Sequence, residues 1–156
     1  MRCASVSDGR LSVADTGLVT DTSSGVAIVV WRRLPELEVL LLHRSAFGES
    51  FAGDWAWTTP GGAREPDEPA AAAATRELYE ETGLRLSCTP VPSRLAAAQG
   101  GIDVEVFAAE LDTDQPVRLS DEHDRHEWVQ AADLDRCLPQ WVRKMYLEVL
   151  ESVRRG

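Results

Sequence analysis

Three glutamates in one short segment, Glu77, Glu80 and Glu81, have the type and spacing of metal ligands. In a helix, residues at i, i+3 and i+4 lie on one face, so these carboxylates are neighbours that repel one another. Glu80 and Glu81 also lie just before Gly83, where the negative end of the helix dipole disfavours acids by roughly 0.3 to 1 kcal/mol each. Because two local rules are broken without structural gain, the segment is expected to serve a function.

Local signals predict the helix that carries these glutamates. Pro69 suits a first helical turn, residues Ala70 to Ala74 have maximal helix propensity, and Gly83 supplies a left-handed stop. Asp67 and Glu68 are expected near the start of the helix, where capping and the positive end of the dipole favour acids. The glutamates therefore fall in the last turns of the helix.

Oxygen ligands of this kind suit Mg²⁺ or Mn²⁺, which share their remaining positions with water and substrate phosphates. A carbonyl of the turn Gly61-Gly62 is a further candidate ligand, because no side chain blocks the approach of a cation. Arg76 is expected to fix the rotamer of one neighbouring glutamate by a bidentate ion pair. The alternative is a solvated acidic helix face on which Arg76 makes a surface ion pair.

The segment 62–84 resembles the signature of the Nudix hydrolase family, Gly-x5-Glu-x7-Arg-Glu-apolar-x-Glu-Glu-x-Gly-apolar. The matching residues are Gly62, Glu68, Arg76, Glu77, Leu78, Glu80, Glu81, Gly83 and Leu84. Seven fixed letters, each at about 1 in 15, coincide by chance on the order of once in 10⁸ starting positions. The resemblance implies an α/β/α sandwich with a mixed sheet. It also implies divalent-metal-dependent hydrolysis of a nucleoside diphosphate linked to another group.

A second stretch, residues 119–129, is similar to part of two branches of this family. It contains Ser120 and the pair Glu122-His123 before an aromatic-aliphatic strand, as in diadenosine polyphosphate hydrolases and dihydroneopterin triphosphate pyrophosphatases. In those enzymes the glutamate approaches the metal site from a loop, which implies that role for Glu122. An ordinary acidic surface loop is the alternative. A separate zinc site at His123 and His126 is not expected, because a third ligand at known spacing is missing.

The negative charge of the phosphate groups suggests which residues bind metal and which one accepts a proton. Water must attack a phosphorus crowded by anionic oxygens, so metal ions neutralise the phosphates while a carboxylate removes a proton. We assign Glu77 and Glu81 as the principal metal ligands. Glu80 and Glu122 share the roles of additional ligand and base, which the sequence does not separate. Arg76 joins the catalytic set as the partner of the glutamates.

Substrate contacts are expected from the segments before the signature, which resemble the strands found there in many Nudix enzymes. Arg44 is a candidate for binding a phosphate, and a solvated strand end is the alternative. Trp57, Trp55 and Phe47 are candidates for stacking on a nucleobase. At most one of them is expected to touch substrate, because tryptophans near a sheet are more often core. His43 is interpreted as a core or strand-end residue.

Composition fits one domain of this kind. The chain has 156 residues, 44% of them hydrophobic, so it can bury one sizeable core. We expect a single domain over 23–156 and a loose arm or edge hairpin over 1–22. The formal net charge of −10 argues against binding extended nucleic acid, whereas a small nucleotide held through metal ions escapes that objection. The sequence is compatible with a homodimer.

A cytoplasmic location is expected. Cys3, Cys88 and Cys137 are odd in number and lack metal-type spacing, which favours reduced thiols. No signal peptide is apparent, and the longest apolar run, Val26 to Trp31, is too short to span a membrane. Periodicity predicts strands at 26–31, 38–43, 55–59, 94–98, 102–111 and 127–129, and a helix that begins near Pro139.

Three functions from different classes are compatible with these patterns. The favoured one is a pyrophosphohydrolase acting on a dinucleoside polyphosphate or a (deoxy)nucleoside triphosphate. A catalytically silent nucleotide sensor is the second, although the intact acidic set argues against it. An interaction module that uses the acidic surface is the third. The substrate stays open, because residues 81–144 lack the tyrosine that many diadenosine polyphosphate hydrolases use and Gly61-Gly62 replaces a Lys-Gly pair.

Overall fold

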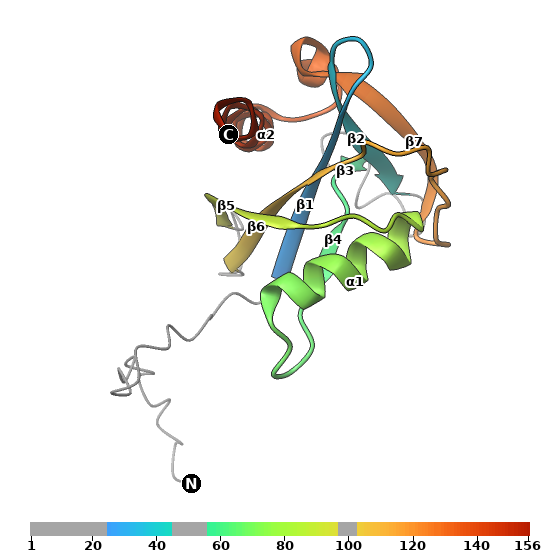
Figure 1. Cartoon of the computed structure of the whole chain (residues 1–156), viewed down its shortest axis with the longest axis vertical. Helices are drawn as coiled ribbons and strands as arrows, with labels where there is room; N and C mark the ends of the chain where they lie inside the picture. The colour runs from blue at the N-terminus through green and yellow to red at the C-terminus, as the bar shows by residue number, and fades with distance from the viewer. Residues whose placement is uncertain (1–24, 45–55, 97–102) are drawn as a thin grey trace, which may run out of the picture.

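Two central strands, β1 (Gly25–Arg33) and β2 (Leu37–Arg44), bury side chains on both faces of a sheet. In β2, Val39 and Leu41 belong to one hydrophobic cluster and Leu40 and Leu42 to another, because successive side chains of a strand point to opposite faces. The computed structural model describes residues 25–44, 56–96 and 103–156. Helices α1 (Ala70–Thr82) and α2 (Gln140–Arg155) cover the two faces (Figure 1). The expected α/β/α sandwich is confirmed.

The sheet is mixed, as expected. Its strand order is β3-β2-β1-β6-β5, while β4 pairs with β1 and β7 pairs with β2. Only the pairing of β1 with β6 is parallel among the strands described. The remaining elements are β3 (Trp57–Thr58), β4 (Gly61–Ala63), β5 (Thr89–Ala96), β6 (Asp103–Glu110), β7 (His123–Gln130) and a 3-10 helix (Ala131–Arg136).

Strands β1 and β2 separate along their length, and this separation makes room for the site. They pair with each other from Trp31↔Val39 to Arg33↔Leu37. Beyond that, β1 pairs with β4 and β2 pairs with β3, so the segment between β3 and β4 lies in the gap. The backbone N–H of Ile28 donates to Pro60 O at 2.8 Å across this gap. Strand β4 is thereby held under helix α1.

Helix α1 ends as predicted but begins differently. Gly83 has a φ of 71°, and its N–H donates to Tyr79 O at 2.8 Å. Pro69 precedes the first helical residue, and no side chain caps the helix. Asp67 has a φ of 62° in the preceding turn, and Glu68 turns its carboxylate toward Arg76. The expected capping role of these two acids is therefore wrong.

Other elements follow the sequence patterns with shifted bounds. Strand β7 has eight residues rather than the expected 127–129, because it pairs with β2 along almost all of that strand. The segment Gly61-Gly62 is part of strand β4 and not a free turn. Strand β5 begins five residues earlier than residue 94, and the 3-10 helix was not predicted. The helix expected from Pro139 is confirmed.

Several expectations fall outside the described residues. These are the arm over 1–22, Phe47, Trp55 and Cys3. In the described part of the chain, Cys88 and Cys137 are free thiols. No helix there has the length and apolar character needed to cross a membrane.

Candidate metal and catalytic site

Two glycines of β4 let helix α1 lay its carboxylates directly on the strand. A Cβ at Gly62 would lie 2.6 Å from Cδ of Glu77, and a Cβ at Gly61 would lie 2.3 Å from Val26 O. The Gly61 N–H donates to Oε2 of Glu81 at 2.9 Å. A larger residue at position 62 would displace the Glu77 carboxylate, and one at position 61 would push β4 away from the backbone of β1. The carbonyl ligand expected from Gly61 or Gly62 stays a prediction.

Arg76 joins three carboxylates of the site. Its Nε and Nη2 donate to the two oxygens of Glu68 at 2.8 and 2.9 Å. Its Nη1 donates to Oε1 of Glu77 at 2.8 Å and to Oε2 of Glu80 at 3.2 Å. The bidentate pair therefore forms with Glu68, and Glu77 is fixed by a single bond. Arg76 lowers the pKa of Glu68 to about 2, which keeps that partner ionised.

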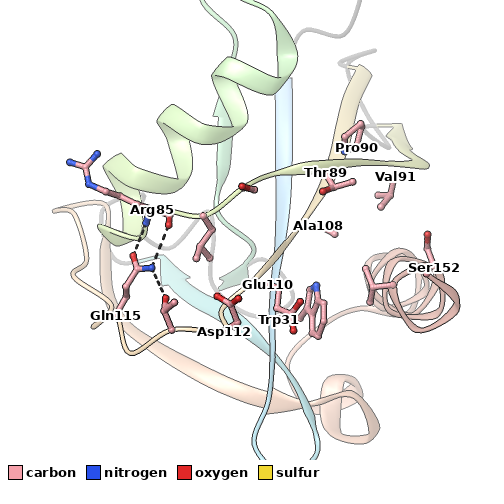
Figure 2. Close-up of a pocket in the computed structure, with 15 residues that line it drawn as sticks. Trp31, Arg85, Thr89, Pro90, Val91, Ala108, Glu110, Asp112, Gln115 and Ser152 are labelled. Atoms are coloured by element: carbon pink, nitrogen blue, oxygen red, sulfur yellow. Dashed lines mark hydrogen bonds between the residues drawn. The ribbon is translucent and has the colours of Figure 1, made fainter.

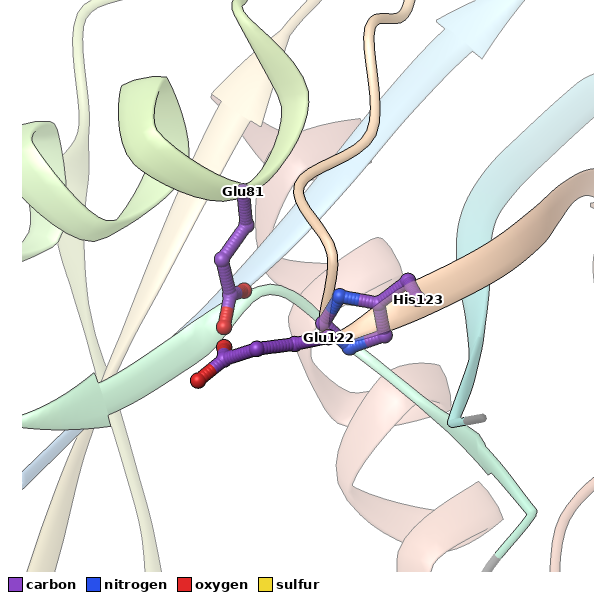
Figure 3. Close-up of side chains that lie close together, drawn as sticks. All are labelled: Glu81, Glu122 and His123. Atoms are coloured by element: carbon purple, nitrogen blue, oxygen red, sulfur yellow. The ribbon is translucent and has the colours of Figure 1, made fainter. Parts of the chain in front are cut away.

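A cavity of about 270 Å³ lies between the end of α1, strand β4 and the start of β7. Glu81 enters it from α1, and Glu122 enters it from the turn before β7. Figure 3 shows that their carboxylates face each other, with the ring of His123 beside them. Ligand atoms of these three residues lie within 4.8 Å of one another. The lining residues are Arg44, Thr58, Thr59, Gly61, Gly62, Ala63, Glu77, Glu81, Glu122 and His123.

The cavity gathers negative charge in a partly buried place. Glu81 is only 6% exposed, and burial raises its pKa to about 8, with Glu77 and Glu122 adding to the rise and the Gly61 N–H opposing it. Burial also raises the pKa of Glu77. A bound cation would offset the repulsion among these carboxylates once they ionise. Glu81, Glu122 and His123 together offer ligand atoms able to hold a metal ion.

Arg44 brings positive charge to the same cavity. It ends strand β2, and its Nη2 donates to Oγ1 of Thr58 at 3.2 Å. Burial lowers the pKa of Arg44, and the carboxylate of Glu81 opposes that shift. A guanidinium at the mouth of an acidic cavity can bind a phosphate oxygen without displacing a metal ion.

Glu80 lies apart from this group. Its side chain is 57% exposed and it bonds Arg76, and it does not line the cavity. The difference follows from helix geometry, because Glu77 and Glu81 are one turn apart whereas Glu80 is rotated from both toward solvent. The structure thus brings Glu77, Glu81 and Glu122 into one cavity and leaves Glu80 on its rim.

Trp57 and His43 form a separate contact beside the site. Their ring centroids lie 5.0 Å apart in an edge-to-face arrangement, and Nδ1 of His43 lies 2.7 Å from Oδ1 of Asp124. The guanidinium of Arg125 lies 5.4 Å from the Trp57 ring. Trp57 packs against a hydrophobic cluster and does not line the cavity. Its contact with substrate stays a prediction.

Comparisons with known proteins agree with this geometry. The family model described as NUDIX domain matches residues 22–149, which is most of the chain. The chain belongs to the Nudix hydrolase family. The likeness to the Nudix signature is therefore confirmed at the level of the family and of the fold.

This Nudix domain has relatives with different names. It is 38% identical over 117 residues to an octanoyltransferase of Myxococcus xanthus, covering 71% of this chain and 31% of that protein. It is 39% identical over 59 residues to diphosphoinositol polyphosphate phosphohydrolase 2 of Homo sapiens, covering 38% of this chain and 29% of that protein. The chain therefore spans about a third of the length of these relatives. An Ap4A hydrolase structure from C. elegans shares its fold, with a TM-score of 0.71, 23% identity and coverage of 85% and 98%.

A larger cavity of the Nudix domain, about 600 Å³, lies away from the glutamates. Figure 2 shows it between the segment at Arg85, the start of β5 and the C-terminal part of α2. Gln115 borders it by accepting from the Arg85 N–H at 2.9 Å and donating to Thr113 Oγ1 at 2.7 Å. Among the residues that the structure describes, it brings together no metal-ligand group of the kind at Glu81. The smaller cavity is therefore the better candidate for catalysis.

His123 is the residue of the site that sequence reasoning missed. The sequence gives no reason to expect a zinc site at His123 and His126, and it assigns His123 no other role, but in the structure His123 lies with Glu81 and Glu122. Burial lowers the pKa of His123, with Glu122 opposing, so the neutral ring is favoured. His126 is exposed. The available signal was that His123 directly follows Glu122 at the start of a strand.

Proposed function

We propose that this Nudix domain hydrolyses a pyrophosphate bond in a nucleoside diphosphate derivative with the help of Mg²⁺ or Mn²⁺. The observation that carries the proposal is the meeting of Glu81 from α1 with Glu122 from the turn before β7. Two carboxylates from distant parts of the chain share one cavity with Arg44. If Glu81 were only part of a solvated acidic helix face, nothing would favour a second carboxylate, Glu122, from 41 residues away lying next to it.

The proposed chemistry uses the residues in different roles. Glu77 and Glu81 would hold the metal ions, which when bound would neutralise phosphate oxygens and make a bound water more acidic. Arg76 fixes Glu77 through its 2.8 Å bond. Arg44 orients a phosphate. Glu122 accepts the proton as the water oxygen forms a bond to phosphorus and the bridging P–O bond breaks.

Glu122 is favoured over Glu80 as the base because of its surroundings. Glu122 lines the cavity, whereas the Glu80 carboxylate is already bonded by Arg76 and points outside it. A base must come within hydrogen-bond reach of the attacking water, directly or through one further water. Glu80 is proposed as an additional metal ligand, which it can become only if its side chain rotates toward the cavity.

A neighbouring cavity supports a substrate with a group beyond its phosphates. This cavity, of about 500 Å³, shares with the acidic one Arg44, Thr58, Thr59 and the segment 61–63. Its other lining residues are Gly25, Val26, Ala27 and Val104. An apolar surface continuous with a phosphate site suits a nucleobase or another weakly polar group. A dinucleoside polyphosphate or a (deoxy)nucleoside triphosphate has this composition.

The names of the relatives widen the set of substrates to test. One relative is called a diphosphoinositol polyphosphate phosphohydrolase and one structural neighbour an Ap4A hydrolase, so both a diphosphorylated polyol and a dinucleoside polyphosphate belong in a screen. Extended nucleic acid is not proposed, because the net charge is −10. A homodimer and a cytoplasmic location stay predictions.

The test is a screen of such compounds with the full chain and Mg²⁺ or Mn²⁺, with products separated by chromatography. Hydrolysis in H₂¹⁸O would show which phosphorus is attacked. The proposal expects at least one compound to be cleaved by the wild type and not by Glu81→Gln. Tight binding of a nucleotide without turnover by either protein would favour the silent sensor instead.

A further inference from the structure

One buried group of the cavity has no role in the mechanism proposed above. His123 is only 7% exposed, and its side chain lies against Glu81 and Glu122. Its Nδ1 is buried and has no hydrogen-bond partner among the described residues. In Figure 3 the edge of the ring that carries its nitrogens faces the two carboxylates. One nitrogen of the imidazole, Nδ1, is thus buried and without a partner in a side chain that lines an acidic cavity.

Packing alone does not account for a histidine at this position. A buried polar atom without a partner loses its hydrogen bonds to water without replacement, and most such atoms in native proteins have a partner. The backbone of His123 is satisfied separately, because its N–H donates to Ser120 O at 3.2 Å. An apolar side chain would fill the same space without that cost. A ligand for the ring nitrogen would remove it.

The distances fit a ligand shared with the carboxylates. Two ligands on opposite sides of one ion lie about 4.2 Å apart, since each bond is about 2.1 Å long. The three candidate atoms lie within 4.8 Å of one another without any ion.

We propose that His123 is a nitrogen ligand of the divalent ion that Glu81 holds, with Glu122 beside it as the base, and that this nitrogen shifts the site's preference from Mg²⁺ toward Mn²⁺ and Co²⁺. This inference rests on the divalent-metal site of the proposed function. Mg²⁺ prefers oxygen ligands, whereas imidazole suits the transition metals, whose affinity for a given site rises from Mn²⁺ to Co²⁺. A single nitrogen among oxygens therefore favours Mn²⁺ and Co²⁺ relative to a set of oxygens alone.

Pulsed electron paramagnetic resonance of bound Mn²⁺ tests the bond itself, because a coordinated ¹⁴N modulates the electron spin echo. The full-length wild type should show this modulation. Protein made with [¹⁵N]histidine should show the ¹⁵N pattern in its place. Isotope labelling leaves the fold unchanged, so this measurement does not depend on any variant. A ¹⁴N pattern unaltered by labelling, or no nitrogen modulation at all, would overturn the inference.

Variants then assign the nitrogen and measure the preference. His123→Gln should lose the histidine modulation, while His126→Gln, an exposed histidine on the same strand, should keep it. The ratio of Mn²⁺ affinity to Mg²⁺ affinity, measured by titration calorimetry, should fall at least about tenfold in His123→Gln. An equal ratio in the two proteins would contradict the proposed preference.

Glu81→Gln distinguishes failure of the proposed metal site from failure of the proposed role of His123. If Glu81→Gln loses Mn²⁺ while His123→Gln keeps both the affinity ratio and the modulation, the metal site stands and His123 is not a ligand. If Glu81→Gln binds Mn²⁺ as tightly as the wild type, the proposed metal site itself is wrong, and the role of His123 is lost with it. Circular dichroism melting of each variant shows that it is folded.

Discussion

The carboxylate of Glu77 lies so close to the backbone of Gly62 that a Cβ there would be 2.6 Å from the Glu77 Cδ. This contact joins the first residue of the Nudix signature to a glutamate 15 residues later, and both residues line the cavity. Since real Cβ atoms essentially never lie under 3.0 Å from another atom, the Glu77 carboxylate would have to shift if residue 62 carried a Cβ. The position of the Glu77 carboxylate and the identity of the strand residue are therefore coupled.

A double-mutant cycle tests this coupling. Gly62→Ala should lower the free energy of unfolding by about 1 to 3 kcal/mol, the usual cost of overpacking. In a Glu77→Ala background the same change should cost much less, because the clashing carboxylate is gone. Urea denaturation of the four proteins without metal gives the coupling energy. Additive effects would show that Gly62 is needed for another reason.

Glu81→Gln should remove nearly all metal-dependent hydrolysis and leave the fold intact. Glu81 is buried beside Glu77 and Glu122, so a neutral amide relieves repulsion in the metal-free protein. Its melting temperature without metal should therefore equal or exceed that of the wild type. Steady-state kinetics measures the loss of metal-dependent hydrolysis, and calorimetry measures the melting temperature without metal. Full activity in the variant would contradict the assignment of Glu81 as a ligand.

The raised pKa of Glu81 also predicts how metal-free stability depends on pH. The pKa is about 8 in the folded protein against an ordinary value of 4.5, so between these values the folded state holds a proton that the unfolded state releases. This group therefore makes the free energy of unfolding fall as the pH rises from about 4.5 to 8. Glu81→Gln should lack that part of the fall. Its stability relative to the wild type should rise between pH 5 and pH 8, measured by urea denaturation in EDTA.

Some of this site can be predicted from local sequence and some cannot. Glu77 and Glu81 are separated by one helical turn, so their shared face follows from helix geometry alone. The same rule places Glu80 next to Glu77, where both accept a hydrogen bond from Nη1 of Arg76, but it does not show that Glu77 and Glu81 line the cavity and Glu80 does not. Glu122 required a resemblance to other proteins, since no local rule brings a turn beside a helix so distant in sequence.

Strand β4 and His123 show the limits set by tertiary contacts. Gly61 and Gly62 have low strand propensity, and the sequence indicates a turn, yet pairing with β1 makes them a strand. The reason for two glycines is the close approach of α1 on one side and β1 on the other. His123 lies against Glu81 only because β7 pairs with β2, a contact that periodicity does not encode.

Metal binding to the folded state alone should stabilise the protein. At a hundredfold excess over Kd, the free energy of unfolding should rise by about 2.7 kcal/mol. The double variant Glu77→Gln/Glu81→Gln should gain much less, because it lacks both principal ligands. Thermal melts with and without Mg²⁺ or Mn²⁺ measure the difference. Equal gains in the two proteins would place the cation elsewhere.

The strictest test of the mechanism is Glu122→Gln. If Glu122 takes the proton from the attacking water, this change should lower kcat by about 10² to 10⁴, the range for a lost positioned base. It should leave the metal-free fold unchanged, because the side chain is exposed. The measurement is kcat at saturating metal and substrate.

Asp121→Asn is the matched control for that variant. It removes a carboxylate one residue away that is also exposed and does not line the cavity, so kcat should change little. Asp124 is unsuitable as a control, because it lies 2.7 Å from Nδ1 of His43 beside the site. A wild-type kcat in Glu122→Gln would show that Glu122 is an ordinary surface residue of its loop and not the base. Glu80 would then become the leading candidate for the base, through rotation of its side chain away from Arg76.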